Sequence, residues 1–150
     1  MRYAMERLTG CVDSWGLNER ECVKYLGARS ESLEDLSLAA YEALKEYGLT
    51  RICVHASQFA LACSRLPPEV EVEALTTACR AAAAQTMGGS LAEGFRKAGR
   101  LPRSRVGQRI ERLEGANLIV VPAFVNPSPR ILTGLGDCFA AVQAVMALCR

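Results

Sequence analysis

The feature that most constrains the fold of this chain is a set of short apolar segments that do not alternate with polar residues. Arg51–His55 contains Ile-Cys-Val at its centre, and residues 118–122 read Leu-Ile-Val-Val-Pro. A strand that is apolar at consecutive positions is buried on both faces, as in a sheet covered by helices on two sides. Residues 59–63 are a further strand candidate of the same kind.

Segments with the spacing of amphipathic helices separate these strand candidates. Ser32 and Asp35 stand at the spacing of a capping box, and Gly48 follows the last helical residue. Strands that alternate with helices predict an α/β fold, a Rossmann-like layered sheet with flanking helices in a single domain over residues 1–150. The expected helices cover residues 1–9, 18–27, 32–48, 67–87, 91–97 and 139–148.

Two more strands are predicted from weaker patterns. Residues 11–13 form a short candidate followed by a turn over residues 14–17, and Ile131 with Leu132 forms another before two glycines. The segment 88–107, rich in Gly, Arg and Ser, is expected to be a loop around one short helix.

The composition excludes several classes of protein. A net charge of +2 gives no basis for nucleic-acid binding. No signal-peptide pattern and no bilayer-spanning apolar run are present, so we expect a cytoplasmic protein that does not bind membranes. The seven cysteines form no Cys-x-x-Cys pair and there is one histidine, which favours reduced, buried thiols over disulfides or a zinc site.

The segment Gly134-Leu135-Gly136-Asp137 precedes the apolar helix near the end of the chain. A glycine turn that leads into a helix presents free N–H groups and the positive end of the helix dipole, which suit an anion such as phosphate. Asp137 beside that anion could accept a proton from a hydroxyl that attacks phosphorus, which suggests phosphoryl transfer. A tetrapeptide this short also occurs as an ordinary strand-to-helix turn.

A second motif, Asn18-x-x-Glu21, allows two interpretations. Asn18 as the N-cap and Glu21 three residues later form a capping box with asparagine in place of serine. The carboxylate of Glu21 is also suited to hold Mg²⁺-bound water near a phosphate, because Mg²⁺ keeps several waters and needs few protein carboxylates. The two roles are compatible.

Taken in order, these motifs resemble the ribokinase-like superfamily, and most closely its ADP-dependent glucokinase and phosphofructokinase family. The stretches that carry the resemblance are residues 13–21, 51–56, 120–122 and 132–137. The resemblance implies the C-terminal part of the large domain of a kinase that transfers a phosphoryl group from ADP to a sugar hydroxyl, with Mg²⁺ as cofactor.

The same resemblance assigns roles to individual residues. Asp137 would be the catalytic base, and Asn18 with Glu21 would belong to the magnesium and phosphate network. A hydrogen-bonded core histidine is the alternative to a nucleotide-binding role for His55. The residues implied at the remaining sites are Gly134, Leu135 and Gly136 in the anion hole, and His55, Val121, Val125, Asn126 and Pro127 at the nucleotide.

Enzymes of this family are much longer than this chain, because the preceding part supplies the lid and most sugar contacts. We therefore expect a nucleotide-binding portion that is inactive alone and needs either a separately encoded N-terminal half or a second copy. One alternative is a non-catalytic nucleotide-binding or assembly module of the same descent. Another is an independent α/β domain that has no open groove at residues 134–137.

Overall fold

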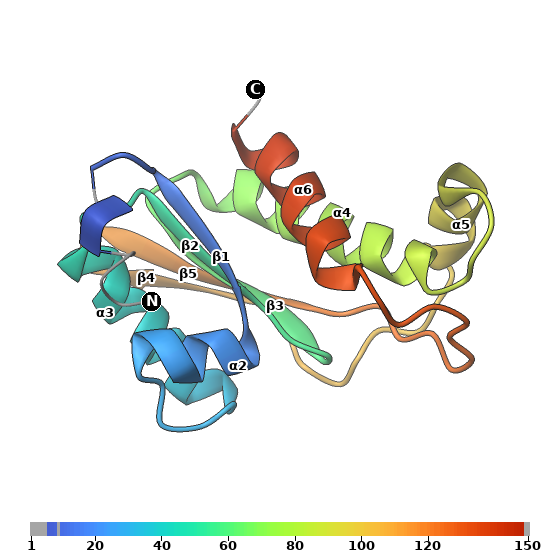
Figure 1. Ribbon diagram of the computed structural model, residues 1–150, viewed down its shortest axis with the longest axis horizontal. Coiled ribbons are helices and arrows are strands. Elements are labelled where there is room, and N and C mark those ends of the chain that lie inside the picture. Colours follow the sequence, from blue (N-terminus) through green and yellow to red (C-terminus); the bar gives the residue numbers. More distant parts are fainter. Residues whose placement is uncertain (1–5, 9, 149–150) are drawn as a thin grey trace.

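The computed structural model describes residues 6–8 and 10–148 and is built on one mixed sheet (Figure 1). The strand order is β1-β2-β3-β5-β4. β1 runs parallel to β2, and every other neighbouring pair is antiparallel. The strands are β1 (Ser14–Asn18), β2 (Arg51–His55), β3 (Phe59–Ser64), β4 (Arg109–Leu113) and β5 (Ala116–Pro122).

Helices cover both faces of this sheet. On one side α3 packs against β2 and β3, while on the other α4 packs against β3 and β5 and in turn supports α5 and α6 (Figure 1). No helix in the described part of the chain is both long and apolar enough to cross a membrane. The helices are α2 (Glu19–Glu21) with the π-helix η1 (Cys22–Leu26), α3 (Leu33–Glu46), α4 (Pro68–Gln85), α5 (Leu91–Ala98) and α6 (Leu135–Leu148).

The centre of the sheet is buried on both faces, as the uninterrupted apolar segments predict. In β2, Ile52 and Val54 belong to the core on the α3 side, whereas Cys53 packs with residues of α4 and α6. β5 alternates in the same way, with Val120 toward α3 and Val121 toward α4. The predicted α/β fold with flanking helices is therefore confirmed, and burial of these two apolar layers is its main source of stability.

The predicted helices are confirmed with shifts of a few residues. Ser32 caps α3 by accepting a hydrogen bond from the N–H of Asp35 at 3.2 Å. α6 begins at Leu135, earlier than the predicted start at residue 139. Of the helix expected over residues 1–9, residues 6–8 are helical, and residues 1–5 and 9 lie outside the described residues.

Two strand predictions are wrong. The first strand lies at Ser14–Asn18, where a turn was expected, because this segment pairs in parallel with β2. Ile131 and Leu132 form no strand; the N–H of Ile131 donates instead to the carbonyl of Thr86, at the end of α4, at 3.2 Å. β4 has no counterpart among the predicted strands, since its residues are mostly exposed and charged.

Four cysteines are small core residues, whereas Cys11 is exposed and Cys138 half-buried, contrary to the prediction of buried thiols. Cys22, Cys53, Cys63 and Cys79 are buried free thiols, as predicted, and Cys149 lies outside the described residues. Burial raises the pKa of Cys22 to about 11 and that of Cys79 to about 12. These thiols therefore stay protonated at neutral pH, which makes them poor nucleophiles.

One ion pair is fully buried between the sheet and α4. Nε of Arg51, in β2, lies 2.6 Å from Oε1 of Glu71, and neither side chain is exposed to solvent. Nη1 and Nη2 of Arg51 and Oε2 of Glu71 have no hydrogen-bond partner within the described residues. Each charge thus depends on the other, since a buried charge without its partner is strongly destabilising.

We expect Glu71→Leu to lower the free energy of unfolding by about 3–5 kcal/mol, because it leaves the Arg51 charge buried alone. The double variant Arg51→Met, Glu71→Leu should recover most of that loss, since both charges are removed. Glu114→Gln, which breaks the exposed Lys45–Glu114 pair, is the matched control and should change the free energy of unfolding little, because solvent screens that pair. Urea unfolding measures all three; a Glu71→Leu variant as stable as the control would contradict the expectation.

Candidate functional site

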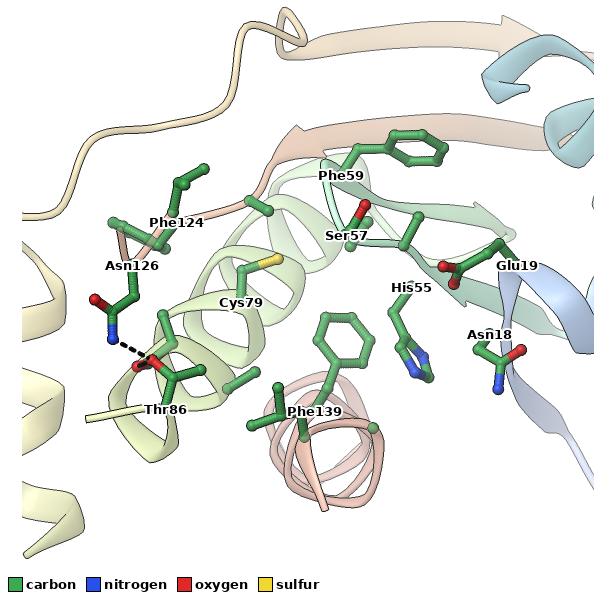
Figure 2. Close-up of a pocket in the computed structure, with 18 of the residues that line it drawn as sticks. Asn18, Glu19, His55, Ser57, Phe59, Cys79, Thr86, Phe124, Asn126 and Phe139 are labelled. Carbon is green, nitrogen blue, oxygen red and sulfur yellow. Dashed lines mark hydrogen bonds between the residues drawn. The ribbon is translucent and has the colours of Figure 1, made fainter. Parts of the chain in front are cut away.

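The main cavity of the protein lies where three strands end. β1, β2 and β5 point the same way in the sheet, and their carboxyl ends all reach a cavity of about 580 Å³ (Figure 2). The last turns of α4 and the first turn of α6 complete the walls. In α/β sheets this edge is the usual position of a ligand site.

The first turn of α6 gives this cavity a group of free donors. Gly134 adopts a left-handed φ of 69° and its carbonyl accepts the N–H of Cys138 at 3.0 Å. The N–H groups of Leu135, Gly136 and Asp137 precede the first intrahelical donor and so have no partner within the helix. Because glycine has no side chain to cap them, they remain available to an anion.

His55 connects the two halves of the site. Its imidazole lies between Asn18 and Phe139 (Figure 2), with the ring centroids of His55 and Phe139 5.1 Å apart. A Cβ atom at Gly136 would stand 2.9 Å from Nε2 of His55, so a side chain at this position would collide with the ring. His55 therefore sets the distance between the end of β1 and the start of α6.

The charges of three carboxylates act on this histidine. Burial lowers the pKa of His55 below its ordinary value, while the negative charges of Glu19, Glu21 and Asp137 act in the opposite direction. Burial is the stronger effect, so the imidazole is uncharged at neutral pH. The carboxylates come from α2 and α6, so negative charge converges on this end of the cavity from both sides.

Asn18 and Glu21 form the predicted capping box. The N–H of Asn18 donates to Oε2 of Glu21 at 2.9 Å, and the N–H of Glu21 donates to Oδ1 of Asn18 at 2.8 Å. The described residues contain no group of three or more His, Cys, Asp or Glu side chains that could hold a metal ion. A cation near Glu21 would therefore take few protein ligands and keep its waters, as Mg²⁺ commonly does.

The segment after β5 is fixed to the end of α4. Nδ2 of Asn126 donates to Oγ1 of Thr86 at 2.7 Å (Figure 2), and Oδ1 of Asn126 accepts from the N–H of Ser128 at 3.0 Å. The N–H of Arg130 donates to the carbonyl of Thr86 at 2.7 Å. Most of the cavity wall is apolar, which suits a flat ring. Its apolar residues include Phe59, Ala60, Ala82, Ala83, Phe124 and Phe139.

The cavity unites only part of the predicted site. Asp137 is exposed beside it, whereas Val121 is fully buried behind it in the core with Phe139. The predicted residues that line the cavity are Asn18, His55, Val125, Asn126, Leu135 and Gly136, and those that do not are Glu21, Val121, Pro127, Gly134 and Asp137.

Several lining residues were missed by sequence reasoning. Glu19 and Arg20 line the cavity and could have been found, because they stand between the two named residues of the capping box. Thr86 and Phe139 gave no signal, since their positions depend on how α4 and α6 pack together. The predicted residues thus account for only part of a larger, mostly apolar cavity.

We expect Gly136→Ala to destabilise the protein by about 1–3 kcal/mol, because the new methyl group must displace the packed ring of His55. Gly107→Ala is the matched control, since a Cβ atom there meets nothing within 4 Å. Thermal or urea unfolding compares the two variants. Equal stability of both would show that the ring of His55 moves freely.

We expect His55 to titrate below its ordinary pKa of about 6.5. Because its folded pKa is lowered, the unfolded chain binds more protons, and the free energy of unfolding falls as the pH drops from about 7 toward the folded pKa. The chain contains one histidine, so proton NMR follows its titration directly. His55→Gln should remove this part of the pH dependence; a pKa at or above the ordinary value would contradict the burial argument.

The sequence matches no family model and no curated protein. Solved structures, however, share the fold. A phosphofructokinase from Pyrococcus horikoshii OT3 with AMP aligns with 97% of this chain and 38% of its own, at 20% identity and a TM-score of 0.82. A last common ancestor of ADP-dependent phosphofructokinases from Methanosarcinales aligns with 100% of this chain and 40% of its own, at 18% identity and a TM-score of 0.83.

An ADP-dependent kinase in complex with fructose-6-phosphate and ADPβS aligns with 100% of this chain and 43% of its own, at 18% identity and a TM-score of 0.85. The chain thus spans about two-fifths of the length of these structures. The resemblance inferred from the motifs is confirmed at the level of the fold: this chain has the fold of part of an ADP-dependent phosphofructokinase.

Proposed function

We propose that this chain is the nucleotide-binding part of an ADP-dependent sugar kinase. The observation that carries the proposal is the first turn of α6, whose Leu135 and Gly136 line the same cavity as Asn18 and His55, within a fold shared with ADP-dependent phosphofructokinases. A part outside residues 1–150, such as a separately encoded N-terminal half or a second copy, would supply the sugar site and the lid.

The N-terminus of α6 would hold the phosphoryl group in transfer. The N–H groups of Leu135, Gly136 and Asp137 lie at the positive end of the dipole of the 14-residue helix α6. A helix N-terminus of this kind suits a phosphate group. Donors fixed in advance stabilise charge on the transferring group without reorganising during the reaction. Gly134 allows the turn, and its lack of a side chain leaves the donors uncovered.

Asp137 would act as the catalytic base. It would accept the proton of a sugar hydroxyl, whose oxygen forms a bond to the β-phosphorus of ADP while the bond from that phosphorus to the bridging oxygen breaks and AMP leaves. Asp137 is exposed, a position that a sugar on a second protein part could reach. Such a part would also exclude water, which otherwise competes with the sugar for the phosphoryl group.

Mg²⁺ would be held through Glu21, with Asn18 fixing that carboxylate by the capping box. When bound, the ion would neutralise charge on the phosphate groups. The apolar wall and the segment over residues 123–129 would border the adenine, with Val125, Asn126 and Pro127 nearest to it. His55 would space the two ends of the site, and Val121 would support the wall from the core.

A second function is favoured by one observation. The chain covers only 38–43% of the structures that it matches, and a base with an anion hole cannot position a hydroxyl that no site holds. A non-catalytic module that binds nucleotide, or that serves assembly, would keep the cavity and the α6 turn but have no turnover.

Calorimetry with ADP, AMP and ATP in the presence of Mg²⁺ tests the proposal. We expect ADP to bind, and Asp137→Ala to bind it nearly as well, because the helix N–H groups remain. When the chain is combined with the product of the neighbouring upstream gene, fructose 6-phosphate or glucose should be phosphorylated with ADP. Asp137→Ala should lower that rate about 100-fold or more.

Glu69→Ala is the matched control, because Glu69 is an exposed acidic residue in the first turn of α4 and lies outside the cavity. Binding of ADP without turnover in any combination would favour the non-catalytic module. Absence of binding at millimolar nucleotide would overturn both functions.

A further inference from the structure

Arg20 is a positively charged residue in the cavity wall, and the Asn18-x-x-Glu21 motif assigns it no role. It lies in α2 between Asn18 and Glu21, is exposed to solvent, and lines the cavity together with Leu135 and Gly136 of α6. The capping box holds both ends of its turn. A long, charged side chain therefore extends from a fixed piece of backbone at the rim of the site.

The charges around the cavity make this arginine unusual. Glu19, Glu21 and Asp137 all act on His55, which is itself uncharged at neutral pH. Of the residues that line the cavity in the described part of the chain, Arg20 alone carries a positive charge. A ligand with several phosphate charges would therefore meet one carboxylate, that of Glu19, and one guanidinium in the cavity wall, so the attraction of the lining side chains for it depends on Arg20.

The guanidinium of Arg20 is also available for a ligand. Within the described residues it has no hydrogen bond or ion pair, whereas Arg51 pairs with Glu71 and Arg80 donates to the carbonyl of Phe95. Glu19, its neighbour in the sequence, does not face it, because adjacent residues of a helix point in different directions. An arginine that is anchored at its backbone and unpaired at its tip suits bidentate binding of phosphate.

We propose that Arg20 binds the phosphate groups of a nucleoside diphosphate in this cavity and gives the site its preference for a phosphorylated ligand over the free nucleoside. This inference rests on the proposed nucleotide-binding function. In this anion site, Arg20 contributes a long side chain, and α6 contributes N–H groups that are fixed by the helix backbone. The guanidinium bonds phosphate oxygens directly and offsets the repulsion from the neighbouring carboxylates.

Calorimetry of the full chain with ADP, AMP and adenosine, in the presence of Mg²⁺, tests the role. We expect Arg20→Ala to weaken ADP binding about tenfold or more, to weaken AMP binding less, and to leave adenosine binding unchanged. Arg20→Lys should lie between the wild type and Arg20→Ala, because lysine keeps the charge but loses the bidentate geometry. The salt dependence of ADP binding should decrease in Arg20→Ala.

Arg29→Ala is the matched control, since Arg29 is an exposed arginine of the next loop outside the cavity. It should bind all three ligands as the wild type does. If the wild type binds ADP and Arg20→Ala binds it as tightly as the control, the role of Arg20 is overturned while the nucleotide-binding function stands. An equal loss for ADP and adenosine would also overturn it, because the effect would then be structural. Failure of the wild type to bind ADP would overturn both.

Discussion

Burial of the sheet on both faces is the constraint on which the rest of this structure depends. Because α3 covers one face and α4 with α6 covers the other, every residue in the middle of β2, β3 and β5 must fit an apolar layer. The Arg51–Glu71 pair enters that core only as a matched pair. The polar side chains of the candidate site lie instead at the ends of the strands. At one such end, Asn18 of β1 and His55 of β2 are paired in the sheet register. The position of the cavity thus follows from how the core is packed.

Most of the fold could be predicted because its signals are local. The apolar strands, the double proline before α4 and the cap at Ser32 each act within a few residues. The failures arise where pairing at a distance decides the structure. Ser14–Asn18 contains glycine and asparagine and reads as a turn, yet β2 offers it an edge to pair with. Ile131 has strand propensity, but the end of α4 takes its N–H. β4 is an exposed edge strand, which needs no apolar pattern at all.

The sequence predicts the parts of the site that depend on a glycine turn and a helix cap. It does not predict which residues form the walls of the cavity. The left-handed φ of Gly134 and the capping box at residues 18–21 each depend on a few neighbouring residues. Such local features can be read directly from the sequence. The contact of His55 with Gly136 joins residues far apart in the chain, and only the packing of α6 against α4 brings them together. The same packing hides Val121 behind Phe139, although its sequence neighbours suggest a ligand contact.

Of the two interpretations of Asn18-x-x-Glu21, the structure shows the capping box, and the magnesium role stays a prediction that is compatible with it. The capping box uses Oε2 of Glu21 to bind a backbone N–H, and it thereby fixes that carboxylate where its charge, like that of Glu19, acts on His55. A fixed cluster of negative charge repels phosphate unless a cation lies between them. The wall formed by α6 attracts phosphate through its free N–H groups. Under the proposed function, a phosphorylated ligand would therefore sit against α6 and a cation would offset the charge of the carboxylates, so the cap that starts α2 would also fix part of the charge of the site.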